Sequence, residues 1–307
     1  MEKINIGGQA VIEGVMMRAP RSVAIAVRRP SGEIVVKKDE VVPLSERFPI
    51  VKLPIVRGAV ALFASLIIGI KALNFSANEA MVEEEGEEKE KEELSSWAMA
   101  GTMAVAFGFG ILLFFVLPLY VTKLLTQMAV ISDNNIIFNL VDGVIRVAVF
   151  LIYIWSISRM KDIQRVFQYH GAEHKSIFAF EAGEELTVEN VRKYSCLHPR
   201  CGTSFLLIVM LVSIVIFSMI PKLWPFYMKA GSRVVLLPLI AGVSYELLKW
   251  SAKNDHSSLV KMIIAPGLAL QRLTTREPDD SQLEVAIRSM EEALAVNAGY
   301  KDDRLVI

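Results

Sequence analysis

One long uncharged and apolar segment of this chain constrains its fold more than any other feature. It runs for 26 residues, from Trp97 to Thr122. An α-helix rises about 1.5 Å per residue, so about 20 apolar residues suffice to cross the hydrocarbon core of a bilayer. Hydrophobic residues make up 53% of the chain, and its mean hydropathy is +0.43. We therefore expect a mainly α, polytopic helical membrane protein.

Three further apolar segments are expected to cross the membrane, which gives about four transmembrane helices. They are 136–158, 204–220 and 234–245 with its flanks. The first contains Asp142 and Arg146 one helical turn apart, where opposite charges can pair and lower the cost of burial. The uncharged segment from Gly58 to Ile70 has only 13 residues. It is too short for a crossing, so we expect a re-entrant or interfacial segment there.

The distribution of basic residues predicts the orientation of these spans. Residues 1–57 contain ten Lys and Arg, residues 159–203 contain seven, and residues 123–135 contain one. Loops rich in Lys and Arg stay in the cytoplasm. Four spans place both basic segments on that side, with the N- and C-termini cytoplasmic.

Local patterns predict the soluble parts of the chain. Alternation in Ser22–Val27 and a valine-rich stretch from Glu33 to Val42, joined by a turn, predict a β-hairpin. Ser281, followed three residues later by Glu284, predicts the start of an amphipathic helix that packs on its own protein. The predicted segments are a cytoplasmic cap (1–57), an interfacial or re-entrant helix (58–75), an acidic linker (76–96), a transmembrane hairpin (97–158), a cytoplasmic loop (159–203), a second transmembrane hairpin (204–250) and a cytoplasmic tail (251–307).

One short motif in the cytoplasmic loop could carry chemistry. His170 and His174 lie four residues apart, so on a helix they face one way and could share a divalent metal, with zinc the first choice. Together with Glu173 they form an HxxEH pattern, in which the glutamate takes a proton from water and a third ligand comes from downstream. We expect Glu173 to be catalytic and Glu246 to be a candidate third ligand.

Further metal-ligating side chains follow within a short distance. Cys196, His198 and Cys201 have a spacing that can wrap a tetrahedral metal. They could join the site of His170 and His174, or the two thiols could form a second, structural site. The alternative is that these are free thiols and hydrogen-bonded histidines in a reducing cytosol.

The glycine-rich block at the N-terminus has two interpretations. Its glycines could simply allow tight packing of the cap. Alternatively, Gln9, Glu13 and Arg18 could complete a polar substrate-binding site above the metal, together with Lys175 after the HxxEH motif. The block lacks the Gly-Lys-Ser/Thr ending of a phosphate-binding loop.

Five sequence blocks resemble the YqhQ family of bacterial integral membrane proteins. They are GGQAVIEGVMMR (7–18), HGAEHK (170–175), CLHPRCGTSF (196–205), YELLKW (245–250) and PGLALQRLTTREPDDSQLEVAI (266–287). The family is a domain of unknown function whose members are described as predicted metal-dependent enzymes. The resemblance implies a metal and the bacterial cytoplasmic membrane, but no reaction. Its motif positions here are Gly7, Gly8, Glu13, Arg18, His170, Glu173, His174, His198, Cys201 and Glu246.

Two functions from different classes are consistent with these patterns. The first is a membrane-embedded metal-dependent hydrolase that acts at the cytoplasmic leaflet on a lipid-like or membrane-adjacent substrate. The second is a membrane scaffold or transport component with a structural metal site. With 33 basic and 33 acidic residues the chain offers no electrostatic reason to bind nucleic acid. The expected partners are membrane lipid and an amphiphilic substrate, and homo-oligomerisation is left open.

Overall fold

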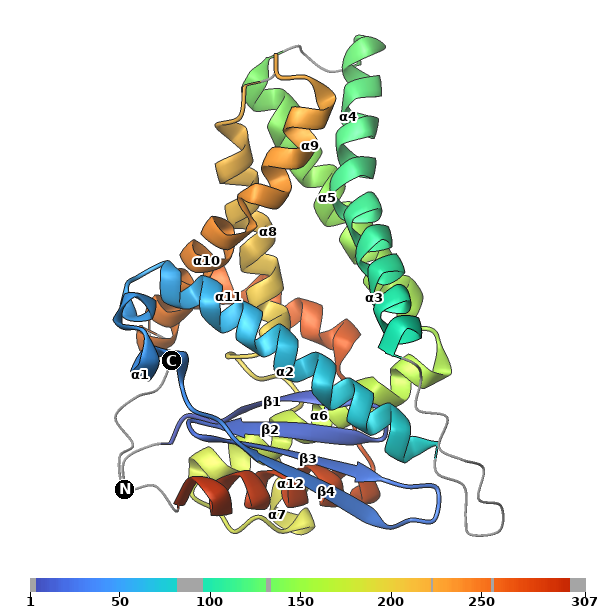
Figure 1. Cartoon of the computed structure of the whole chain (residues 1–307), viewed down its shortest axis with the longest axis vertical. Helices are drawn as coiled ribbons and strands as arrows, with labels where there is room; N and C mark the ends of the chain where they lie inside the picture. Colours follow the sequence, from blue (N-terminus) through green and yellow to red (C-terminus); the bar gives the residue numbers. More distant parts are fainter. Residues whose placement is uncertain (1–3, 82–95, 131–133, 222, 255–256, 299–307) are drawn as a thin grey trace.

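The chain folds into a layer containing a β-sheet and a layer of long apolar helices above it (Figure 1). The computed structural model describes residues 4–81, 96–130, 134–221, 223–254 and 257–298. The acidic stretch 82–95, most of the predicted linker, lies outside the described residues. The described part is mainly helical with a small antiparallel sheet near the N-terminus, as predicted.

Four antiparallel strands form the sheet in the order β1-β2-β3-β4. They are β1 (Gly7–Val11), β2 (Gly14–Ala19), β3 (Ser22–Arg28) and β4 (Ile34–Glu40). The predicted hairpin is confirmed as β3 and β4, which pair from Ser22↔Glu40 to Arg28↔Ile34. The glycine-rich block supplies two strands that the sequence analysis did not predict. A turn with Glu13 at φ of 50° joins them.

Helices pack on both faces of the sheet, and successive side chains of a strand point to one face and the other in turn. On one face Val15, Met17, Ala24 and Ala26 pack with apolar residues of two helices, α6 (Lys161–Ala182) and α12 (Asp280–Ala298). On the other face Met16 and the valines and isoleucine of β3 pack against α2 (Val56–Ala80). Within the layer that contains the sheet, the sheet therefore lies between α2 on one face and α6 with α12 on the other. Helix α7 (Val188–Arg192) packs beside α6 and α12.

The C-terminal amphipathic helix packs on its own protein, as expected, but its cap differs from the prediction. Asp279 Oδ1 accepts a hydrogen bond from the backbone N–H of Gln282 at 3.0 Å, and Gln282 Oε1 accepts one from the N–H of Asp279 at 3.0 Å. This reciprocal pair is a capping box shifted by two residues from the predicted Ser281 and Glu284. Aspartate and glutamine can form the same hydrogen bonds as serine and glutamate. The sequence contains a suitable pair three residues apart at both positions.

The helical layer contains the apolar segments. The longest is α3 (Ser96–Ile111), which continues through a π-helical turn (Leu112–Val116) into α4 (Leu117–Gln127). The others are α5 (Asn135–Ile157), α8 (Gly202–Ser218), α9 (Phe226–Val235), α10 (Leu237–Lys253) and α11 (Ser258–Thr274). Two short turns, α1 (Leu44–Arg47) and a 3₁₀ helix (Pro49–Lys52), precede α2.

By length and composition, three described helices could cross a membrane, or up to four if a bent pair is one span. The three are Val56–Ala80, Gly101–Gln127 and Asn135–Ile157, and the pair is α9 with α10, bent by 45°. The helix α8 is apolar but shorter. The prediction of a short segment at 58–75 was wrong in length, because the helix continues past Lys71 to Ala80. In Figure 1 this helix, α2, crosses the sheet obliquely rather than standing with α3, α4 and α5.

Candidate metal centre

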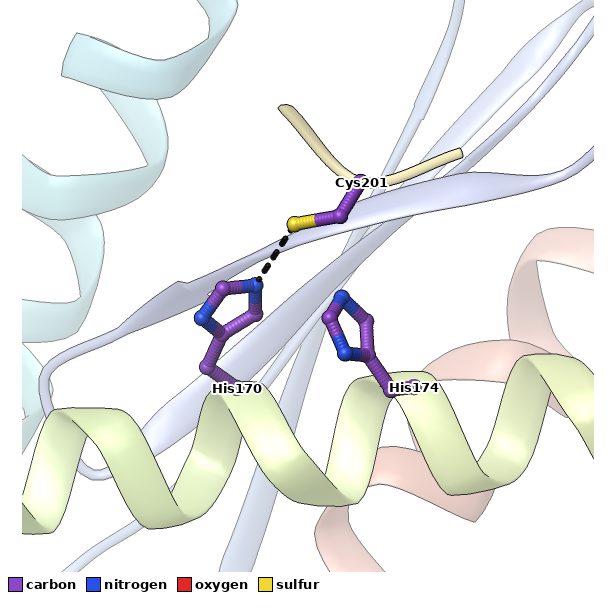
Figure 2. Close-up of side chains that lie close together, drawn as sticks. All are labelled: His170, His174 and Cys201. Carbon is purple, nitrogen blue, oxygen red and sulfur yellow. Dashed lines mark hydrogen bonds between the residues drawn. The ribbon is translucent and has the colours of Figure 1, made fainter. Parts of the chain in front are cut away.

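Two histidines and a cysteine from distant parts of the chain meet at the junction of the two layers. His170 and His174 lie one turn apart on α6, and Cys201 is the N-cap of α8, where its sulfur accepts from the N–H of Thr203. One ligand atom from each of the three lies within 4.8 Å of the others. Figure 2 shows both imidazoles on the same side of α6, with the Cys201 side chain between them and above.

Backbone carbonyls fix the orientation of both imidazole rings. His170 Nδ1 donates to the carbonyl of Thr274 at 2.8 Å, and His174 Nδ1 donates to the carbonyl of Cys196 at 2.5 Å. With the proton on Nδ1, each ring turns the lone pair of Nε2 toward the cluster. Metal-binding histidines commonly have their second nitrogen held in this way, which fixes the tautomer and the ring plane.

The Nε2 atoms of the two imidazole rings differ in their contacts. His170 Nε2 lies 3.2 Å from Cys201 Sγ, whereas His174 Nε2 is buried and has no hydrogen-bond partner in the described part of the chain. Burial lowers the pKa of His174, so the ring is neutral at neutral pH. A buried, neutral nitrogen beside a thiol and a second imidazole forms a group that could hold a metal ion.

The predicted catalytic glutamate lies beside this cluster in a cavity of about 330 Å³. Glu173 is buried and accepts a hydrogen bond from the backbone N–H of Gly8 on β1. A Cβ atom on Gly8 would lie 2.9 Å from the Glu173 side chain, so the strand can approach only without one. Desolvation raises the pKa of Glu173 above its usual value. Both layers line the cavity, since Tyr245 and Leu248 of α10 also face it.

His198 faces the same cavity but lies outside the three-residue cluster. Its ring centroid is 5.7 Å from that of His174. Burial lowers the pKa of His198 to about 4, so the ring is neutral. Its Nε2 is buried without a hydrogen-bond partner among the described residues and lies 3.6 Å from a carboxylate oxygen of Glu181.

Two other predicted residues of the loop have different partners. The Cys196 thiol donates to Glu277 Oε2 at 3.2 Å, and burial together with that carboxylate raises its pKa to about 12. The residue contributes its carbonyl to His174 rather than its sulfur to the cluster. Lys175 is buried and binds the carbonyl of Arg192 at 2.9 Å and the Glu277 carboxylate. Its ammonium therefore ties α6 to two segments and does not line the cavity.

Glu246, the predicted third ligand, is not part of the group formed by His170, His174 and Cys201 and binds a different residue. Both of its carboxylate oxygens accept hydrogen bonds from the guanidinium of Arg57, with Oε1 at 2.6 Å. This ion pair joins α10 to the start of α2. The sequence analysis used Arg57 only as one of the basic residues that predict topology, so its pairing with Glu246 was missed.

The N-terminal candidates Gln9, Glu13 and Arg18 lie on β1, in the turn after it and on β2, and none of them lines the cavity. Glu13 binds Arg165 and lies 3.3 Å from the hydroxyl of Tyr169. Gln9 packs on α2, where a Cβ atom at Gly69 would lie 2.5 Å from its Oε1. Arg18 contacts the Ser65 hydroxyl at 3.3 Å, and burial lowers the pKa of its guanidinium.

Two residues that support the centre were not predicted from the sequence. The Gln271 side chain accepts a hydrogen bond from the backbone N–H of His198 at 2.8 Å and donates one to the carbonyl of His198 at 2.8 Å. These two bonds hold the loop before Cys201. Gly171 lies where α6 touches the segment after α11, and a Cβ there would be 2.1 Å from the carbonyl oxygen of Arg276. Both lie in the sequence blocks named above, but nothing in their local spacing indicates these contacts.

Comparison with known proteins gives one family and one relative. A family described as "Protein of unknown function (DUF1385)" matches residues 53–296. The chain is similar to "Uncharacterized protein YqhQ" of Bacillus subtilis (strain 168), with 35% identity over 299 residues, covering 95% of this chain and 93% of the relative. No solved structure matches the chain.

Proposed function

The chain belongs to the DUF1385 family, and from that premise we propose that it is a membrane-embedded, metal-dependent hydrolase with its site at the cytoplasmic leaflet. The match to this family and the 35% identical relative confirm the resemblance to the YqhQ family. The observation that carries the proposal is a three-donor cluster of which two members, His174 and Cys201, line one cavity together with the buried carboxylate of Glu173. The substrate class that this cavity favours is lipid-like or membrane-adjacent.

His170, His174 and Cys201 are the residues that would hold the metal. Two imidazoles and one thiolate make three protein ligands, which is the number typical of catalytic zinc sites, where one position stays open. A divalent ion bound there supplies Lewis-acid polarisation of a carbonyl or phosphoryl oxygen. The carbonyls of Thr274 and Cys196 hold the two rings in the required orientation.

Glu173 is the proposed general base. It removes a proton from the attacking water and returns it to the leaving group. A carboxylate with a raised pKa is a better base at neutral pH than an exposed one, and burial gives Glu173 that property. The N–H of Gly8 holds the carboxylate in place, so that strand β1 contributes to the geometry of the reaction.

The membrane part of the proposal rests on the exposed apolar surface of the helical layer. Large side chains such as Val105, Phe109 and Leu112 are exposed on a helix long enough to cross a bilayer. Exposed apolar surface of this extent is expected to contact lipid. The cavity lies where this layer meets the sheet, so an amphiphilic substrate could reach it with its apolar part still among the helices.

One observation favours the alternative of a structural metal site in a scaffold or transport component. The buried Nε2 of His198, which has no hydrogen-bond partner among the described residues, is a fourth donor on the same cavity. Four protein ligands close a zinc site and argue for a structural role. In that case the metal would hold α6, the loop and α8 together.

Glu173→Gln separates the two functions. The full-length protein in detergent is incubated with a bacterial lipid extract and with a membrane-protein digest, and products are quantified by mass spectrometry. If the protein is a hydrolase, the wild type releases products. The rate of product release by Glu173→Gln should be lower by a factor of at least about 100, the typical effect of removing a general base, and its metal content should be unchanged. Glu189→Gln, the same substitution at an exposed glutamate of α7, is the matched control and should keep activity. Full activity of Glu173→Gln, or no product from the wild type, would favour the structural site.

A further inference from the structure

A second cavity lies at the end of the helical layer that is far from the sheet. It has a volume of about 350 Å³ and is lined by residues of α4, the start of α5 and the start of α9. This volume is at the lower end of the range of ligand-binding pockets, about 300 to 1,000 Å³. Nothing in the proposed hydrolase requires this cavity, which is separated from the metal centre by the length of the helical layer (Figure 1).

The lining of this cavity combines positive charge, hydrogen-bond donors and aromatic rings. Lys123 of α4 and Lys229 of α9 both face it, and none of the lining residues described is an Asp or Glu. The ammonium of Lys229 lies 4.5 Å from the ring centroid of Phe138, which restrains its position. Thr126 and Gln127 add a hydroxyl and an amide, and Trp224 closes one side.

The backbone adds to the positive potential of the cavity. Helix α9 has ten residues and begins at Phe226, which lines the cavity. Its first intrahelical hydrogen bond runs from Lys229 N–H to the carbonyl of Pro225. The N–H groups before Lys229 have no acceptor within the helix, and the helix dipole places a partial positive charge at this end.

A buried ionic cluster lies one helical turn deeper. Asp142 accepts hydrogen bonds from Arg146 at 2.6 Å and from Arg233 at 2.9 Å. All three side chains are almost fully buried. Two guanidinium groups face one carboxylate, so the cluster itself retains one positive charge, and Nε of Arg233 has no hydrogen-bond partner in the described part of the chain.

Helical spacing connects this cluster to the cavity. Lys229 and Arg233 are four residues apart on α9, and Phe138 and Asp142 are four residues apart on α5, so each pair shares a helix face about one turn, or 5.4 Å, apart. The charge of the cluster is poorly screened because it is buried. It therefore adds to the attraction of the cavity for an anion.

We infer that this cavity binds a phosphate group, held directly by Lys123, Lys229 and the first N–H groups of α9. The phosphate could belong to the headgroup of an anionic phospholipid or to free inorganic phosphate, because both present the same anionic oxygens. Phe138 and Trp224 line a cavity at the end of the apolar helices, the position where aromatic residues accompany lipid headgroups in membrane proteins.

The test measures binding by the full-length protein in a nonionic detergent. It is titrated with short-chain phosphatidylglycerol, with phosphatidylcholine of the same chain length, and with sodium phosphate against sodium chloride at equal ionic strength. The variants are the double substitution Lys123→Gln/Lys229→Gln and, as a matched control, Lys161→Gln/Lys193→Gln in the sheet layer. Tryptophan emission of the wild type minus that of Trp224→Phe reports on this cavity without altering any charge.

The expected result is that an anion changes the emission of Trp224 and that its Kd rises at least tenfold in the Lys123/Lys229 variant but not in the control. Preference for phosphatidylglycerol over phosphatidylcholine, with no effect of phosphate, would identify the lipid headgroup. An equal response to free phosphate would identify the inorganic ion. The inference is overturned if phosphatidylglycerol and phosphatidylcholine act alike while phosphate acts like chloride, or if the charge variant, with an unchanged melting temperature, binds as tightly as the wild type.

Discussion

Replacing Gly171 by alanine tests whether the close contact behind the histidines supports the metal centre. The added Cβ would lie 2.1 Å from the carbonyl oxygen of Arg276, which is backbone and cannot rotate away. Helix α6 would have to move away from this segment, whose Thr274 carbonyl also accepts a hydrogen bond from His170. The backbone hydrogen bond from Arg276 to Phe167, 2.9 Å long, lies in the same contact.

Opposing effects on the free energy of unfolding can be estimated for this substitution. Alanine is favoured over glycine inside a helix by about 1 kcal/mol. Overpacking against a fixed neighbour costs about 1 to 3 kcal/mol, and loss of the Arg276 hydrogen bond costs about 1 kcal/mol. The net expectation is a loss of about 1 to 3 kcal/mol, opposite in sign to helix propensity.

The assay is denaturant unfolding of the purified protein, with metal content as a second readout. Gly108→Ala is the matched control, because Gly108 lies in α3 and a Cβ there would meet nothing within 4 Å. The control should be unchanged or slightly more stable. Equal stability and equal metal content in Gly171→Ala and the wild type would refute the reasoning, since the helix would then have accommodated the extra atom without displacing the centre.

Two further predictions concern buried charge and a protected thiol. Asp142→Asn leaves Arg146 and Arg233 without their common carboxylate, and breaking such a buried pair is expected to cost about 3 to 5 kcal/mol, measured by unfolding in detergent; a loss below about 1 kcal/mol would contradict it. Cys196, with a pKa near 12 instead of 9, has about a thousandfold less thiolate at pH 8 than an ordinary thiol. Labelling of Cys196 by iodoacetamide should therefore be slow at pH 8, and its rate should rise with pH up to about 12. At pH 8 the labelling should be faster in Glu277→Gln. Rapid labelling of the wild-type residue at pH 8 would argue against its burial beside Glu277.

The sequence predicted the parts of the site that depend on local spacing. His170 and His174 face one way because α6 is a helix, and Glu173 lies beside them for the same reason. Cys201 was included because it lies close in sequence, and the cap of α8 places it within reach. Apolar length likewise predicted most of the long helices, because the number of residues needed to cross a bilayer is set by helix geometry.

Contacts between distant segments were not predictable in the same way. Glu246 was proposed as a ligand from its chemistry and its position downstream of the histidines, yet it pairs with Arg57, 189 residues earlier. The pair of Asp142 and Arg146 was predicted from i, i+4 spacing, but the second arginine, Arg233, comes from another helix. Strands β1 and β2 were missed because glycines and Glu13 interrupt the alternation. Strand β2 pairs with β3, and β1 pairs with β2.

Metal analysis of the two cysteine variants tests the central claim most directly. The two thiols are five residues apart, but only Cys201 lies with the histidines, while Cys196 binds Glu277. Plasma mass spectrometry of detergent-purified protein should find about one divalent metal per chain in the wild type and in Cys196→Ser, and a loss of that metal in Cys201→Ser and His174→Ala. Equal metal content in all four proteins, or loss in Cys196→Ser but not in Cys201→Ser, would contradict the proposed centre.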